Sequence, residues 1–188
     1  MADLPEIMDA NLPMSIDPQT VFPWLSLIVL LPAVGALIMP FLPTQESKNS
    51  NLPRNISLII LLADFFIIVG AFSNLFDPSS ESLQLVERLQ WLPSIGLEWS
   101  LGVDGISAPL VVLSGLITLL SAAASWKVKQ KTRLYFALLL IQASAQALVF
   151  LSQDFLLFFL AWELELVPVY LLIAIWGGKR KLYAATKF

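Results

Sequence analysis

Two carboxylates in an unbroken apolar run, Glu163 and Glu165, predict proton or ion chemistry inside a membrane. The run 155–176 has 22 residues, and all but the two glutamates and Pro168 are hydrophobic. At about 1.5 Å of rise per residue, a helix of this length spans a bilayer. An acid at the centre of such a span costs on the order of 2.5–3.5 kcal/mol, with Asp taken as a proxy for Glu. We therefore expect a site that binds a proton or an ion, with Glu163 the stronger candidate and Glu165 the weaker.

The spacing of the two acids separates their surroundings. Residues two apart on a helix point about 200° from each other, so at most one glutamate faces a given interior seam. Pro168 removes a backbone donor, and its ring clashes with the carbonyl of Leu164. We expect a kink there, which would free a carbonyl between the acids and add a polar group to a proton relay.

The composition places the chain among integral membrane proteins. Of its 188 residues 57% are hydrophobic and only 13% are charged, against about 25% charged in soluble domains. The chain has no Cys and no His, which removes disulfides, thiolate metal sites and the usual haem, zinc and copper ligands. We expect no metal, cofactor or redox centre in this chain, and the bilayer rather than nucleic acid as its surroundings.

The apolar segments predict an all-α membrane fold with five spanning helices. We expect an exposed acidic tail over 1–21 and a transmembrane domain over 22–188. Its outer loop, 74–104, contains an alternating pattern over 97–103 that predicts a strand, as one half of a β-hairpin. A sixth helix is expected to start near Leu182 and to be cut off at Phe188. The five spans are expected at about 22–42, 56–73 (with 52 as an alternative start), 106–126, 134–151 and 155–176.

The basic residues predict the orientation of the chain. Ten of the eleven Lys and Arg fall in the segments after the first, third and fifth spans, and only Arg88 falls on the opposite side. By the positive-inside rule, the N-terminus lies outside and the basic loops face the cytoplasm or its equivalent. We interpret these loops as topology signals, and the tryptophans at span ends (Trp24, Trp126, Trp176) as interface anchors.

A third acid, Asp64, lies near the middle of the second span. A functional role and a role in joining two helices both remain open for it. None of the five predicted spans contains Lys or Arg. The polar neighbours available to Glu163 within these residues are therefore Asp64, serines, water, and Gln142 and Gln146, which share one face of the fourth span. A cationic partner must come from outside these residues.

The last segment resembles a known family. The motif Trp-Glu-Leu-Glu-Leu-Val-Pro-Val-Tyr over 162–170, with Phe-Pro-Trp at 22–24 and Leu-Gly-Val-Asp-Gly-Ile-Ser at 101–107, is similar to chain 4 subunits of NAD(P)H-quinone oxidoreductases. These are the antiporter-like membrane subunits of the complex I family in cyanobacteria and chloroplasts. The resemblance covers about Phe22 to the end, which is the first third of such a subunit.

The resemblance implies a role in proton translocation coupled to plastoquinone reduction. The glutamate after Trp in the family motif maps onto Glu163, which is thought to pair with a lysine on a later, interrupted helix. Iron–sulfur clusters and plastoquinone are then expected in other subunits, which would be the partners of this chain. The implied location is the thylakoid membrane, with the N-terminus in the lumen and the basic loops on the cytoplasmic or stromal side. Two alternatives remain open, namely a cation/proton antiporter subunit and a non-catalytic membrane scaffold fragment.

Overall fold

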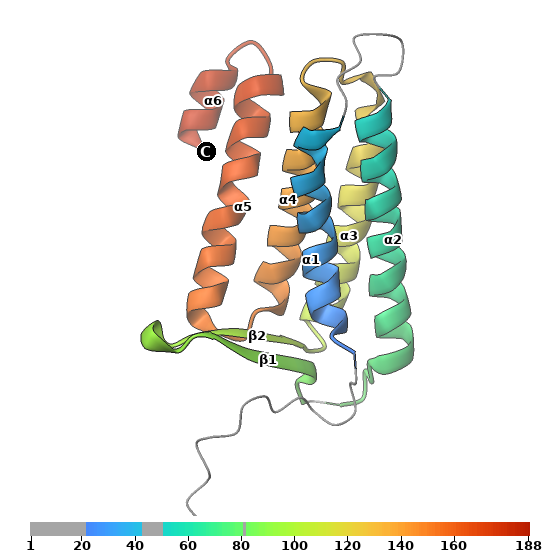
Figure 1. Ribbon diagram of the computed structural model, residues 1–188, viewed down its shortest axis with the longest axis vertical. Helices are drawn as coiled ribbons and strands as arrows, with labels where there is room; N and C mark the ends of the chain where they lie inside the picture. Colours follow the sequence, from blue (N-terminus) through green and yellow to red (C-terminus); the bar gives the residue numbers. More distant parts are fainter. Residues whose placement is uncertain (1–21, 43–50, 81) are drawn as a thin grey trace, which may run out of the picture.

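The computed structural model describes residues 22–42, 51–80 and 82–188, and within them the fold is a bundle of five long helices (Figure 1). All five are long and apolar enough to cross a membrane, which confirms the predicted all-α membrane fold. The expected acidic tail over 1–21 lies outside the described residues. The five helices are α1 (Trp24–Ile38), α2 (Leu52–Leu75), α3 (Ser107–Ala124), α4 (Thr132–Leu151) and α5 (Phe155–Trp176).

The helix α4 is the centre of the bundle. It packs against α1, α2, α3 and α5, and its residues 136–140 are all buried. In contrast α5 packs mainly on α4 and stands at one edge of the bundle (Figure 1), with only Leu157, Ala161 and Pro168 buried. One face of α5 is therefore left open by the described helices.

The outer loop forms the predicted hairpin, as an antiparallel sheet of β1 (Gln84–Leu92) and β2 (Leu97–Val103) across one end of the bundle (Figure 1). Its turn passes through Gly96, whose φ of 71° lies in the left-handed region that favours glycine. Leu101 of β2 is fully buried and forms a bridge with Ser152 in the link between α4 and α5. The sheet therefore contacts the link that leads into α5, the helix that carries Glu163 and Glu165.

Two aspartates bind backbone N–H groups at the starts of α3 and α5, at the sheet end of the bundle. Asp154 precedes α5, and its Oδ1 accepts a hydrogen bond from the N–H of Leu157 at 2.7 Å. Asp104 precedes α3 and accepts from the N–H groups of Ser107 (2.7 Å) and Ile106 (3.0 Å). The Ser107 backbone bond is the main cause that holds the pKa of Asp104 below its usual value, although slight burial opposes it. Carboxylates in this position satisfy N–H groups that have no partner within the helix.

α2 begins at Leu52, the alternative start expected for the second span, and α4 begins at Thr132, two residues before the expected 134. These starts correct the statement that no span contains a basic residue. α2 starts at Leu52 with Pro53 in its first turn, so Arg54 lies inside the helix and is buried. Arg133 likewise lies in the first turn of α4. The apolar run marks only the hydrocarbon-crossing part, whereas proline is favoured in the first turn of a helix and extends α2 beyond that part.

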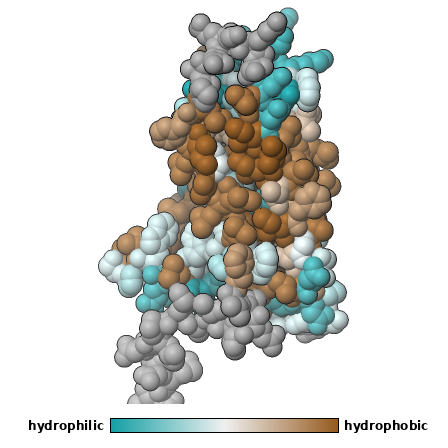
Figure 2. Space-filling model, turned by 45° about the vertical axis from the view of Figure 1, so that its right-hand side comes forward, coloured by the Kyte–Doolittle hydropathy of each residue, from teal (hydrophilic) through white to brown (hydrophobic). Residues whose placement is uncertain are grey.

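The surface is divided as a membrane-spanning bundle requires. On the face drawn in Figure 2, a hydrophobic belt crosses the middle of the molecule and hydrophilic residues gather towards its two ends. After Gly177 and Gly178, the chain turns into a short helix, α6 (Lys181–Lys187), at the end opposite to the sheet (Figure 1). Of the ten Lys and Arg described, all but Arg88 lie at that end, five of them in the α3–α4 and α5–α6 connections.

Candidate functional site

Glu163 lies near the middle of α5, on the face that the bundle leaves open. Its side chain is exposed, and Trp162 and Leu164 beside it are 53% and 47% exposed. Within the described ranges, the Glu163 carboxylate has no hydrogen-bond partner from α1–α4. The described helices therefore do not bury this acid, and its burial remains a prediction for the complete subunit.

Glu165 has a different environment because it faces α4. It is half-buried, and its Oε1 accepts a hydrogen bond from Nε2 of Gln142 at 2.9 Å. This confirms that only one of the two acids faces the interior seam, as the helical spacing required. Gln142, one of the polar neighbours expected for Glu163, lies against Glu165 instead.

Asp64 occupies a third, separate place in the interior between α2, α3 and α4. It is 5% exposed, and its buried Oδ1 has no hydrogen-bond partner among the residues described. The nearby hydroxyls of Ser114 and Thr118 donate back to carbonyls of their own helix, at 2.9 Å each. A cavity beside Asp64 offers about 10 Å³ to the centre of a water molecule, which is close to the minimum for one water. The structure does not bring Asp64 together with Glu163.

Pro168 is buried inside α5, which continues as one helix from Phe155 to Trp176. The kink predicted at this proline remains a prediction about the local direction of the helix. Gly177 ends the helix where a Cβ would collide with the carbonyl oxygen of Ile173. Glycine is therefore required by close backbone approach at this helix end.

Sequence reasoning missed the interactions of Glu87. This residue of β1 is 9% exposed, and its two carboxylate oxygens accept from the N–H groups of Leu25 (2.7 Å) and Ser26 (2.9 Å) in the first turn of α1. The Ser26 hydroxyl donates to the same carboxylate and accepts from Nε1 of Trp99 at 2.8 Å. The residue before α1 is Pro23, which has no side-chain acceptor to cap the helix. This missing cap was the sequence signal that a residue from elsewhere binds the first N–H groups of α1.

The described part of the chain holds no group of three or more His, Cys, Asp or Glu residues placed to bind a metal ion. Three carboxylates, Glu163, Glu165 and Asp64, lie near the middle of their spans and could bind or release a proton. A five-helix membrane bundle with separate acids at Glu163, Glu165 and Asp64 defines a multi-pass membrane protein that carries carboxylates within its spans.

Family models identify that class more closely. Residues 27–152 match the family described as NADH-ubiquinone oxidoreductase chain 4, amino terminus. Residues 152–188 match the family described as NADH:quinone oxidoreductase/Mrp antiporter, TM. The first match covers more than half of the chain, and the chain belongs to the NADH-ubiquinone oxidoreductase chain 4 family.

Curated relatives agree with this assignment. The chain is 54% identical over 167 residues to NAD(P)H-quinone oxidoreductase chain 4 2 of Synechococcus elongatus, covering 89% of this chain and 31% of the relative. It is 55% identical over 171 residues to NAD(P)H-quinone oxidoreductase chain 4 of Prochlorococcus marinus, covering 90% and 31%. The chain thus spans about a third of the length of the curated relatives it matches, at their N-terminal end.

Solved structures share the fold. A chain of respiratory complex I from Thermus thermophilus superposes with a TM-score of 0.68 at 23% identity, covering 86% of this chain and 31% of that one. A chain of the archaeal membrane-bound sulfane sulfur reductase gives a TM-score of 0.65 at 18% identity, covering 87% and 24%. At these identities the similarity concerns the arrangement of helices alone.

Proposed function

We propose that this chain is part of a membrane-arm subunit of a proton-pumping NAD(P)H- or ferredoxin-dependent plastoquinone oxidoreductase, in which Glu163 takes part in proton translocation. Family membership and the names of the curated relatives support the kind of complex. The five spanning helices support a place in its membrane arm. Other membrane subunits of the same assembly would be its partners, and electron transfer would take place in subunits that hold iron–sulfur clusters.

The observation that carries the role of Glu163 is its position on the open face of α5. The neighbouring acid Glu165 is already bound to Gln142 of α4, whereas the Glu163 carboxylate points away from the described helices. A carboxyl at hydrocarbon depth is either protonated or paired with a cation. A positive group that approaches from outside these residues would therefore change the charge of Glu163, and this change would move a proton.

The proposed location is a thylakoid membrane, because the two relatives compared are cyanobacterial. The sheet end of the bundle would face the lumen, and the end with the α3–α4 and α5–α6 connections would face the cytoplasmic or stromal side. Asp64 is a second proposed proton site, separate from Glu163 and lodged in the bundle interior.

Replacing Glu163 by Gln in the complete subunit, within its assembled complex, tests the proposal. We expect quinone reduction to drive at least about tenfold less proton translocation. A positioned side chain that transfers protons as a general acid or base raises the rate of the step on the order of 10²–10⁴-fold. The matched variant Glu165→Gln should keep most of the pumping, since an amide at 165 can still bond to Gln142. Proton uptake by oriented vesicles, measured with a pH-sensitive dye, provides the readout.

Each other outcome assigns a different function. Unchanged pumping by an assembled Glu163→Gln complex would leave only the scaffold function for these residues. Sodium-dependent growth rescue of an antiporter-deficient host by the complete protein would support a cation/proton antiporter instead, and one of the matching family models includes such antiporters.

A further inference from the structure

A buried cation, Arg54, lies at the end of the bundle opposite to the sheet. Its side chain is 8% exposed, and Nη2 donates to the side-chain oxygen of Asn55 at 3.2 Å. Its Nε is buried and has no hydrogen-bond partner among the described residues. Removing a charge from water without an anion beside it is unfavourable. Arg54 therefore calls for a negative group beside it, and no described residue supplies one.

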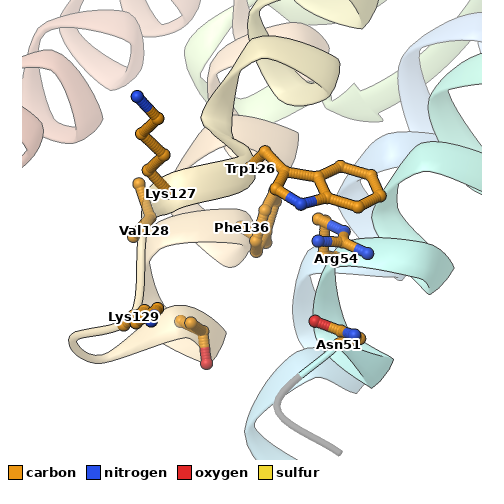
Figure 3. Close-up of a pocket in the computed structure, with 8 residues that line it drawn as sticks. Asn51, Arg54, Trp126, Lys127, Val128, Lys129 and Phe136 are labelled. Carbon is orange, nitrogen blue, oxygen red and sulfur yellow. The ribbon is translucent and has the colours of Figure 1, made fainter.

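The guanidinium group of Arg54 packs against the indole ring of Trp126. Its central carbon lies 3.5 Å from the ring centroid, and Figure 3 shows the group directly beside the ring. This cation–π contact orients the guanidinium but does not neutralise it. Trp126 therefore acts as more than an interface anchor.

A pocket of about 490 Å³ opens beside this pair (Figure 3). Its lining comes from the start of α2, the connection between α3 and α4, and the first turn of α4. Besides Arg54 it includes the exposed Lys127 and Lys129, together with Asn51 and Thr132, and none of the described lining residues carries a carboxylate. In Figure 3 Lys127 extends away from the guanidinium, so Arg54 and Lys129 are the cations available to one ligand. The chemistry of the pocket is that of an anion site.

The depth of the pocket indicates which anion it holds. Trp126 lies just beyond the end of α3, where the apolar span meets the interface. Ile59 of α2 and Leu120 of α3 are 66% and 58% exposed. They lie five residues after Arg54 and six residues before Trp126, which at 1.5 Å per residue is about 7–9 Å further into the membrane. A cationic pocket at the interface and aliphatic side chains exposed further into the membrane are the two features that bind a lipid with an anionic headgroup.

We propose that the Arg54–Trp126 pocket binds the phosphodiester headgroup of an anionic membrane lipid. The free donors of Arg54 bond the headgroup oxygens, Lys129 adds a second positive charge, and the acyl chains run along α2 and α3. Arginine suits this role because its planar group presents several donors to phosphate oxygens while it remains stacked on an aromatic ring.

Photo-crosslinking in the assembled complex tests the site. The complete complex is reconstituted with photoactivatable phosphatidylglycerol, and crosslinked peptides are identified by mass spectrometry. We expect labelling of the peptides around Asn51–Ile59 and Trp126–Thr132, and about tenfold less in Arg54→Gln, because a hydrogen bond to a charged group is worth roughly a tenfold change or more. Lys129→Gln, at an exposed position in the α3–α4 connection, should reduce labelling less.

Three controls separate the lipid from other occupants. Lys179→Gln removes the same charge at the same end of the bundle but outside the pocket, and it should leave labelling unchanged. Arg54→Lys keeps the charge and should retain part of the labelling, which would exclude a simple folding defect. Excess unlabelled phosphatidylglycerol should compete for the site, whereas millimolar inorganic phosphate should not.

Other results would overturn the proposal. Equal labelling by photoactivatable phosphatidylcholine, or unchanged labelling in both Arg54→Gln and Lys129→Gln, would show an ordinary lipid-facing surface. Competition by inorganic phosphate would assign the pocket to a free anion. Absence of lipid labelling, together with a carbodiimide crosslink between Lys129 and a carboxylate of another segment or subunit, would assign it to a protein contact.

Discussion

Neighbouring acids in this chain serve different purposes because a helix turns about 100° per residue. Glu165 faces α4 and accepts a hydrogen bond from Gln142, so it contributes to the packing of α5. Glu163 faces away from the described helices and remains available to another group. Outside the spans, Glu87 uses both carboxylate oxygens to hold the first turn of α1. The position of each carboxylate relative to a neighbouring helix, more than its residue type, decides its role.

The bond pattern of Glu87 predicts a loss of stability in Glu87→Ala. The change leaves the N–H groups of Leu25 and Ser26 without their acceptor at a buried helix start, so we expect a loss of about 1–2 kcal/mol. Thermal unfolding of the purified complete subunit in detergent measures the effect. The matched variant is Glu98→Ala, in the partner strand, whose side chain is half-buried and caps no helix. Equal midpoints for the two variants would contradict the capping role.

At the scale of elements, the central position of α4 depends on close helix approach at Gly35. A Cβ at Gly35 of α1 would lie 2.7 Å from Cδ1 of Ile60 and 3.4 Å from Cδ1 of Leu140. The nearest atoms belong to side chains of α2 and α4, so α1 approaches both helices at this point. Small residues allow this approach between membrane helices.

Gly35→Leu should therefore push α1 away from α2 and α4. We expect a loss of about 1–3 kcal/mol from overpacking, measured as a lower unfolding midpoint of the complete subunit. Gly70→Leu is the matched control, because nothing lies within 4 Å of a Cβ built at Gly70 of α2. Gly35→Ala should be tolerated, since the nearest atom is the mobile end of the Ile60 side chain. The explanation fails if Gly70→Leu is as destabilising as Gly35→Leu.

At the scale of the whole molecule, the two ends of the bundle differ in charge and in structure. The sheet covers one end, where Glu87, Glu98, Asp104 and Asp154 lie, and the other end carries the basic connections between helices. The positive-inside rule predicts that the basic end faces the cytoplasm or stroma. The hydrophobic belt between the ends (Figure 2) is the surface that meets lipid or other helices.

This orientation predicts from which side of a vesicle membrane a reagent can label a single introduced thiol. The 188 residues contain no Cys, so Ser79→Cys and Gln130→Cys each introduce one thiol into this region at an exposed, uncharged position. In oriented vesicles of the proposed thylakoid membrane, a membrane-impermeant maleimide should label position 79 from the side predicted to be lumenal and position 130 from the opposite side. Labelling of both positions from one side would disprove the spanning arrangement, and reversed labelling would disprove the orientation.

Much of the fold was predictable because membrane insertion imposes simple rules on sequence. Apolar runs of about 20 residues must form helices, since backbone groups cannot stay unpaired in hydrocarbon. The five spans, the hairpin near 97–103 and the end of α5 before Gly177 were therefore found. The start of α2 was expected at 56 or at 52, and the structure has it at Leu52, which brings Arg54 into the first turn. Hydropathy alone does not choose between these two starts.

The sequence by itself determined the class of fold, the number of spans, and the fact that Glu163 and Glu165 point to different surfaces. These properties follow from local periodicity and from the cost of exposing polar groups to lipid. Only the tertiary structure decided that Gln142 binds Glu165, that Glu87 caps α1, and that Arg54 stacks on Trp126. Each of these contacts joins residues from 23 to 72 positions apart, so it depends on which helices become neighbours, and no local pattern encodes that choice.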